Sequence, residues 1–158
     1  MATAFPIDTI EFKNIKLREK IGEGGFGAVN RVTFKGYFSK RFKGYKQAAA
    51  KSVFKLEERE IQVMSQLHHK NIVKLIGFSK AAATHIILME YAPNGSLHDY
   101  LFDNSKPLGN ELKQKWAKES ALAIQYLHDR NYLHRDIKPS NCLLFEDCLL
   151  KLCDFGIA

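Results

Sequence analysis

The chain has 158 residues, of which 46% are hydrophobic and 26% are charged, with ordinary use of glycine and proline. This composition is typical of a globular protein and excludes a fibrous or disordered chain. The net charge of +7 is concentrated in residues 1–60, which carry thirteen Lys and Arg residues against seven Asp and Glu residues. Much of the excess lies at 35–46, which we interpret as a solvated loop in preference to a segment that binds nucleic acid or an acidic partner.

The cysteines and the lack of targeting signals indicate the cellular compartment. Cys142, Cys148 and Cys153 are odd in number and show no metal-ligand or redox-pair spacing, which suits a reducing compartment. The sequence shows no signal peptide and no apolar run long enough to span a bilayer. We therefore expect a cytoplasmic protein without a membrane partner.

The first part of the chain has the pattern of a β-rich domain. Residues 1–14 are a short lead-in, and a strand-like pattern then extends from Ile15 to Val53 around a glycine-rich turn at 22–27. The other elements expected in this part are a basic hairpin at 35–46, a helix at about 56–67, and strands at 72–78 and 85–91.

A break with turn chemistry, Tyr91-Ala92-Pro93-Asn94-Gly95, precedes a helical part of the chain. Ser96 resembles the N-cap of a short helix at 97–102. A longer helix is predicted at 110–128. Its apolar positions fall on one face, namely Leu112, Trp116, Ala117, Ala121, Ile124 and Leu127.

Two short strands follow, at 142–145 and 149–153, joined by a turn near Glu146-Asp147. The order of the elements, strands first and helices afterwards, predicts the α+β class. We expect two domains, a mostly β one at 15–92 and a helical one at 93–158.

The glycine-rich segment Gly22-Glu23-Gly24-Gly25-Phe26-Gly27-Ala28-Val29 fits the pattern G-x-G-x-x-G-x-V. Glycines allow backbone N–H groups to approach phosphate oxygens without a Cβ in the way. A dinucleotide-binding turn has a similar pattern but leads directly into a helix. Because residues 29–34 alternate like a strand, we favour a strand–loop–strand phosphate site over a dinucleotide site.

Lys51 follows an apolar strand after the glycine segment, where a cation can pair with the α- and β-phosphates of a nucleotide. A carboxylate is needed to hold it in place, and Glu57, Glu58 and Glu60 are the candidates. Glu60 shares a helical face with Met64 and Leu67, which points it toward the apolar core. We therefore favour Glu60, while Glu57 and Glu58 suit an exposed first turn better.

The end of the strand at 85–91 is a second candidate for nucleotide contact. Backbone groups of Glu90 and Ala92 could hydrogen-bond an adenine edge, and Met89 would limit the depth of the pocket. The simpler interpretation of these residues is an ordinary strand end.

The strongest chemical signal is His134-Arg135-Asp136-Ile137-Lys138-Pro139-Ser140-Asn141, followed by Asp154-Phe155-Gly156. Asp136 would accept the proton of a substrate hydroxyl, and Lys138 would stabilise charge on a transferred phosphoryl group. Asn141 and Asp154 would bind Mg²⁺ through oxygen, as a hard cation prefers. His134 is interpreted as a packed histidine. The alternative is an ordinary polar loop with a turn.

These motifs together resemble the eukaryotic protein kinase domain of the serine/threonine type, from about Ile15 to the C-terminus. Lys138, two residues after Asp136, resembles the serine/threonine form of the catalytic loop. The stretches 60–73, 90–97 and 152–156 are similar to the tyrosine-kinase-like group, especially its mixed-lineage and MAP-kinase-kinase-kinase members.

The resemblance implies a two-lobed fold, with an antiparallel sheet and one helix in the first lobe and only the first part of the helical second lobe. It also implies ATP in the cleft between the lobes, Mg²⁺ as the metal, a protein substrate and a role in intracellular signalling. It places Val29 and Ala49 above the adenine and Leu143 below it. The implied catalytic residues are Lys51, Glu60, Asp136 and Lys138, and the implied metal ligands are Asn141 and Asp154. The implied ATP-binding residues are Ile21, Gly22, Glu23, Gly24, Gly25, Phe26, Gly27, Ala28, Val29, Ala49, Lys51, Met89, Glu90, Ala92 and Leu143.

Besides the alanine run before Lys51, the chain departs from the family pattern in two ways. Glu60 follows Lys51 by only nine positions, which is short for the family. The sequence also stops two residues after Gly156, before the family's activation segment and remaining helices. We expect a partial catalytic domain of an ATP-dependent kinase, truncated after the Asp-Phe-Gly motif. The alternative is a truncated, non-catalytic nucleotide-binding or interfering interaction module.

Overall fold

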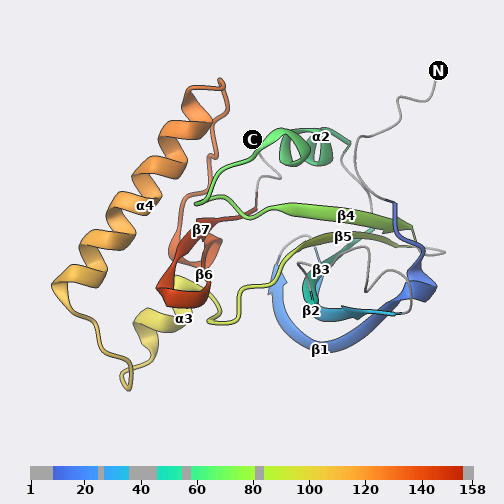
Figure 1. Ribbon diagram of the computed structural model, residues 1–158, viewed down its shortest axis with the longest axis horizontal. Coiled ribbons are helices and arrows are strands. Elements are labelled where there is room, and N and C mark those ends of the chain that lie inside the picture. Colours follow the sequence, from blue (N-terminus) through green and yellow to red (C-terminus); the bar gives the residue numbers. More distant parts are fainter. Residues whose placement is uncertain (1–8, 25–26, 36–45, 55–57, 81–83, 155–158) are drawn as a thin grey trace. The chain divides into compact units, whose positions relative to one another are not determined.

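The computed structural model describes residues 9–24, 27–35, 46–54, 58–80 and 84–154 (Figure 1). The chain divides into two compact units. Unit 1 comprises Met1–Ser65 and Lys74–Tyr91, and unit 2 comprises Gln66–Val73 and Ala92–Ala158. Within the described residues, no helix has both the length and the apolar character needed to cross a membrane.

Unit 1 is built on a five-stranded antiparallel sheet in the order β1-β2-β3-β5-β4. A 3-10 turn, η1 (Phe12–Asn14), precedes it, and the helix of this part is α2 (Glu58–Gln66). The strands are β1 (Ile15–Gly24), β2 (Gly27–Phe34), β3 (Gln47–Val53), β4 (Leu75–Lys80) and β5 (His85–Glu90). The predicted α+β class, with an antiparallel sheet followed by helices, is confirmed.

The strand expected at 72–78 begins later, at Leu75. The reason is that Ile72 and Val73 pair elsewhere, within unit 2. Ile72 forms a parallel bridge with Leu152, and the Val73 N–H donates to the Leu152 carbonyl at 2.9 Å. Residues 72–78, which have the pattern of one strand, therefore pair in two places: residues 72 and 73 with Leu152, and residues from 75 onward with β5.

One hydrophobic cluster of unit 1 lies on one face of the sheet. In β3, Ala48 and Ala50 point to this face, opposite Val32 of β2 and Leu88 of β5. The full cluster is Ile10, Ile15, Val32, Phe34, Ala48, Ala50, Ile76, Ile86 and Leu88. Because side chains alternate along a strand, Ala49 and Lys51 must point to the other face.

Unit 2 contains α3 (Leu97–Phe102), α4 (Asn110–His128) and a two-stranded antiparallel hairpin, β6 (Cys142–Leu144) with β7 (Leu150–Leu152). Two 3-10 turns, η2 (Pro139–Asn141) and η3 (Glu146–Cys148), flank β6. Both predicted helices have the predicted bounds, because the N-cap Ser96 marks the start of α3 and the apolar spacing marks the extent of α4.

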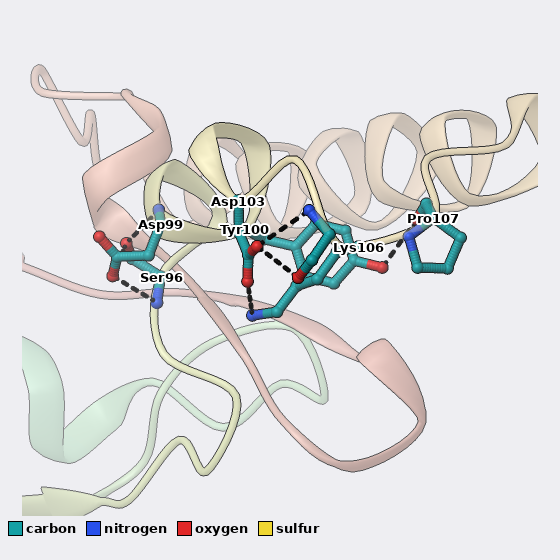
Figure 2. Close-up of polar contacts among 7 residues, drawn as sticks. Ser96, Asp99, Tyr100, Asp103, Lys106 and Pro107 are labelled. Atoms are coloured by element: carbon teal, nitrogen blue, oxygen red, sulfur yellow. Dashed lines mark hydrogen bonds and ion pairs between the residues drawn. The ribbon is translucent and has the colours of Figure 1, made fainter.

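The N-cap predicted at Ser96 is confirmed by a complete capping box. The Ser96 hydroxyl accepts a hydrogen bond from the Asp99 N–H at 3.1 Å, and the Asp99 carboxylate accepts one from the Ser96 N–H (Figure 2). These bonds satisfy backbone donors that the first helical turn would otherwise leave unpaired. They also hold the pKa of Asp99 below its usual range, mainly through the Ser96 side chain.

The loop from α3 to α4 is held by its own polar contacts (Figure 2). Asp103 accepts hydrogen bonds from both the backbone and the hydroxyl of Ser105, and Lys106 lies 3.6 Å from the same carboxylate. The Tyr100 hydroxyl donates to the Pro107 carbonyl at 2.9 Å. The Tyr100 ring also meets Trp116 of α4 edge-on at 5.1 Å, so the start of α4 is fixed against α3.

The buried face of α4 differs in part from the predicted one. Trp116, Ala123 and Leu127 are buried, whereas Ala117 and Ala121 are exposed. At about 100° of rotation per residue, Ala123 and Leu127 lie within about 20° of Trp116, while Ala117 and Ala121 lie about 100° and 140° away. The predicted stripe was too wide because alanine is compatible with either environment.

The segment Gln66–Val73 is anchored in unit 2 by its polar groups. The His68 N–H donates to the Tyr126 hydroxyl at 2.8 Å, and the His69 ring stacks on the Tyr126 ring at 4.8 Å. The Nδ1 of His69 accepts the Asn71 N–H at 3.1 Å. Burial, followed by the charges of Lys70 and Arg130, lowers the pKa of His69 below 6.5.

Gly27, at the start of β2, has no room for a side chain, which gives the first stability prediction. A Cβ on Gly27 would lie 1.8 Å from the Ser52 carbonyl oxygen, and the φ of +140° already disfavours other residues. We expect Gly27→Ala to lower the free energy of unfolding of unit 1 by about 2 kcal/mol or more, as measured by urea denaturation. Gly22→Ala is the matched control, because its Cβ would meet only Val29 at an ordinary 3.8 Å. Equal losses in the two variants would contradict the steric argument.

The lowered pKa of His69 predicts a pH dependence of folding. The unfolded chain, with the ordinary pKa, binds a proton more readily than the folded chain. Stability contributed by the neutral ring is therefore present above about pH 6.5 and declines as the pH falls below it. Urea unfolding at pH 7.5 and 5.5 should show a smaller pH difference in His69→Gln than in the wild-type protein. An unchanged difference would mean that other groups carry the pH dependence.

Candidate active site

The glycine segment forms a strand–turn–strand. Glu23 pairs with Ala28 across β1 and β2, and Gly24 pairs with Gly27. Gly25 and Phe26 lie outside the described residues. Since β2 is a strand paired antiparallel to β1, the helix required by a dinucleotide-binding turn is absent from residues 27–34, and that alternative is excluded. Ile21, just before the segment, is exposed.

Four of the expected nucleotide-binding residues share one face of the sheet in unit 1. Lys51 of β3 stands directly opposite Val29 of β2, and Ala49 stands directly opposite Met89 of β5. Residues opposite each other in a sheet, and residues two apart in a strand, point to the same side. The face that carries Val29, Ala49, Lys51 and Met89 is therefore the one opposite the Ala48–Ala50 core.

Lys51 is buried, with 9% of its surface exposed. A lysine in such a place requires compensation for its charge. Glu60, the expected partner, belongs to the first turn of α2, and its side chain lies outside the described part of the structure. The Lys51–Glu60 pair therefore stays a prediction.

At the strand end after Met89, hydrogen bonds join Glu90 to Lys74. The Glu90 N–H donates to the Lys74 carbonyl at 3.1 Å, and the Glu90 carboxylate accepts the Lys74 N–H at 3.0 Å. The Glu90 N–H is therefore committed, and contact of Glu90 and Ala92 with an adenine edge stays a prediction. In unit 2, Leu143 is half-buried in β6 and bridges to Ser96.

In unit 2, the loop before β6 brings Asp136, Lys138 and Asn141 together. The Lys138 ammonium lies 2.8 Å from Oδ2 of Asp136. The Asn141 side-chain nitrogen donates to both the backbone carbonyl and Oδ2 of Asp136, at 2.8 and 2.9 Å. Both donors thus use the same carboxylate oxygen. Among the described residues, Oδ1 of Asp136 has no hydrogen-bond partner.

These contacts set the charge state of the loop. The hydrogen bond from Lys138 is the largest cause that holds the pKa of Asp136 below its usual value, and Asn141 adds to it. In return, Asp136 raises the pKa of Lys138, with a smaller contribution from the Asp154 carboxylate. At neutral pH, Asp136 is therefore a carboxylate and Lys138 an ammonium.

Asn141 and Asp154 are brought close by the hairpin. The Cys153 N–H, one residue before Asp154, donates to the Asn141 carbonyl at 2.9 Å. Because the Asn141 amide nitrogen faces Asp136, its side-chain oxygen is the atom left for a metal. An amide oxygen and a carboxylate are the donors that Mg²⁺ accepts, alongside water and phosphate oxygens. The described residues contain no cluster of three or more His, Cys, Asp and Glu side chains that could hold a metal by themselves.

His134 has a linking role that its sequence context did not reveal. Its Nδ1 accepts the Asp136 N–H at 3.3 Å, and its Nε2 lies 2.8 Å from the Cys153 carbonyl. An acceptor at Nδ1 requires the proton to be on Nε2, which then donates to that carbonyl. The neighbours Arg135 and Asp154 have positive φ angles of 64° and 67°. The sequence predicted a packed histidine, and its burial is confirmed. The sequence did not predict its contacts with the backbone of Asp136 and Cys153.

The chain matches the protein family described as protein tyrosine and serine/threonine kinase over residues 15–158. It is similar to a Drosophila melanogaster protein described as mitogen-activated protein kinase kinase kinase 7-like. The two are 39% identical over 161 residues, which cover 96% of this chain and 39% of the relative.

Two further relatives come from the same organism. Mitogen-activated protein kinase kinase kinase 7 is 34% identical over 93% of this chain and 22% of its own length. The tyrosine-protein kinase transmembrane receptor Ror is 33% identical over 99% of this chain and 24% of its own length. The chain thus spans less than half the length of these curated relatives.

Proposed function

Since the chain belongs to the protein tyrosine and serine/threonine kinase family, we propose that the protein transfers the γ-phosphoryl group of ATP to a serine or threonine hydroxyl of a protein substrate. The observation that carries this proposal is the hydrogen-bonded group Asp136, Lys138 and Asn141 in one short loop. It unites a carboxylate, a cation and an oxygen ligand, which are the parts that phosphoryl transfer requires.

Asp136 is assigned the role of the base. Oδ2 is held by Lys138 and Asn141, so Oδ1 is the atom that meets the substrate hydroxyl. The lowered pKa keeps the group ionised and able to accept a proton at neutral pH. The cost of a low pKa is a weaker base, but in phosphoryl transfer the orientation of the hydroxyl matters more than basicity.

Lys138 is assigned to charge stabilisation. Its ammonium is fixed beside Asp136 and is influenced by Asp154, so it lies among the groups that would surround the transferred phosphoryl. A fixed cation there stabilises the negative charge on the equatorial oxygens. A lysine two residues after the base also favours serine or threonine over tyrosine as the acceptor.

We assign Mg²⁺ to Asn141 and Asp154. The donor chemistry fits, because both offer oxygen and the Asn141 nitrogen is occupied by Asp136. When bound, Mg²⁺ neutralises charge on the β- and γ-phosphates. Two protein ligands suffice, since Mg²⁺ usually completes its shell with phosphate oxygens and water.

The nucleotide itself is assigned to residues of both units. In unit 1, these are the glycine segment and the sheet face with Val29, Ala49, Lys51 and Met89. Lys51 pairs with the α- and β-phosphates, and Glu60 holds Lys51 in this proposal. Glu90, Ala92 and Leu143 complete the adenine contacts. The corresponding domains are a β-rich one at 15–92 and a helical one at 93–158.

We place the protein in cytoplasmic signalling. None of the three cysteines forms a disulfide, which suits a reducing compartment. Two of the relatives reported above are named as mitogen-activated protein kinase kinase kinases or as similar to one.

Two substitutions in the complete protein test these roles. Asp136→Ala should lower phosphate transfer to a generic protein substrate by about 10²- to 10⁴-fold while nucleotide affinity changes little. Lys51→Met should weaken both binding and transfer. The measurements are radiolabel transfer from ATP and calorimetric titration with nucleotide.

Asp129→Ala is the matched control, because Asp129 is an exposed aspartate at the end of α4 and has no assigned role. Unchanged transfer by Asp136→Ala would remove Asp136 from the mechanism. If the wild-type protein binds nucleotide but does not transfer phosphate, it is a nucleotide-binding module and not an enzyme.

A further inference from the structure

The two proposed Mg²⁺ ligands lie at the open end of one short hairpin. Asn141 immediately precedes β6, and Asp154 follows β7 by two residues. Their separation depends on the register of the hairpin, which pairs Cys142 with Leu152 and Leu144 with Leu150. A slip by one residue would move one ligand along the strand and turn its side chain to the other face.

The hairpin is too short to determine this register alone. Each strand has three residues, and a two-stranded hairpin in water is marginal even when it is longer. The turn carries a local cost, because Asp147 and Cys148 have φ angles of 55° and 54°, a left-handed conformation that costs a non-glycine residue about 1–2 kcal/mol. Its own backbone bonds run from the Leu149 N–H to the Glu146 carbonyl at 3.1 Å and from the Phe145 N–H to the Leu149 carbonyl at 2.8 Å. Contacts from outside the hairpin add to the stability of this closed end.

Three polar side chains of α4 bond to the backbone of this closed end. The Lys115 ammonium donates to the carbonyls of Asp147 and Cys148, at 3.2 and 2.7 Å. The Trp116 Nε1–H donates to the same Cys148 carbonyl at 2.9 Å. The Glu119 carboxylate accepts the Leu150 N–H at 2.9 Å, and its other oxygen lies 3.1 Å from Lys115.

These bonds stabilise the observed register. The Cys148 carbonyl and the Leu150 N–H lie two residues apart, and each meets a complementary group on α4 in the observed pairing. In a slipped hairpin the carboxylate of Glu119, which is 12% exposed, would lose its backbone donor. The helix is itself held in place by the contact of Trp116 with Tyr100.

We propose that Lys115, Trp116 and Glu119 are positioning residues that set the spacing of Asn141 and Asp154 for Mg²⁺-dependent nucleotide binding. This inference rests on the proposed function, since the Mg²⁺ site belongs to it. The three side chains act through the turn and the hairpin backbone, and they touch neither metal nor nucleotide.

The test is a calorimetric titration of the complete protein with ADP at a series of Mg²⁺ concentrations and in EDTA. Glu119→Ala should raise the Mg²⁺ concentration needed for half-maximal gain in ADP affinity by about tenfold, the low end for residues that orient metal ligands. Affinity in EDTA should stay at the wild-type value. Glu119→Gln keeps an oxygen acceptor for the Leu150 N–H and should restore most of the Mg²⁺ response.

Hydrogen exchange gives a readout that needs no ligand. In Glu119→Ala, and in Trp116→Phe, which keeps the ring but loses the donor, the Leu150 and Cys153 amides should exchange faster than in the wild-type protein. Amides of the sheet in unit 1 should be unchanged. Glu111→Ala is the matched control on the same helix, because Glu111 is an exposed glutamate in the first turn of α4.

A Mg²⁺ midpoint in Glu119→Ala equal to that of the wild-type protein would overturn the positioning role. So would an equal loss of ADP affinity with and without Mg²⁺, which is the behaviour expected from general destabilisation. A wild-type protein whose nucleotide affinity does not respond to Mg²⁺ would instead overturn the proposed function, and this inference with it.

Discussion

The contacts of Asn141 are those on which the proposed catalytic loop of unit 2 depends. Its side-chain nitrogen donates to both the backbone carbonyl and the carboxylate of Asp136, while its backbone carbonyl accepts the Cys153 N–H. One buried residue thus holds the proposed base, leaves its side-chain oxygen for the proposed metal and ties the loop to the hairpin. A side chain with both donor and acceptor is required, and an aspartate here would place a second negative charge against Asp136.

In unit 1, one sheet contributes both to a hydrophobic cluster and to the proposed nucleotide-binding surface. The alternation of β3 does both, since Ala48 and Ala50 pack in the core while Ala49 and Lys51 face the other side. Small alanine side chains fit at this central strand because it has a neighbour on each edge. The same alternation, together with strand pairing, places Val29 and Met89 beside Ala49 and Lys51.

Backbone strain is concentrated near the proposed chemistry. Among the described residues, every non-glycine residue with positive φ lies in the short stretch between Asn131 and Asp154. Such conformations cost about 1–3 kcal/mol each and persist only where the surroundings hold them. Here the surroundings are specific hydrogen bonds, from His134 near Arg135 and from α4 near Asp147 and Cys148. The loop geometry is therefore maintained by unit 2 as a whole.

The sequence by itself determined those features that depend on neighbouring residues. The bounds of α3 and α4, the cap at Ser96 and the grouping of Asp136, Lys138 and Asn141 all follow from local spacing, because a helix or a short loop brings together residues a few positions apart. The succession of strands and helices along the chain, and with it the α+β class, followed from the period of the apolar residues.

Only the tertiary structure decided what depends on contacts between distant residues. Ile72 and Val73 belong to unit 2 because Leu152 pairs with them, and no local pattern distinguishes this from a longer β4. Ala123, not Ala121, is buried in α4 because alanine carries too little hydrophobic surface to reveal its own environment. The links from His134 to Cys153 and from α4 to the hairpin turn each join a side chain to a backbone group. Because every residue possesses the same backbone groups, the sequence does not reveal which of them a side chain meets.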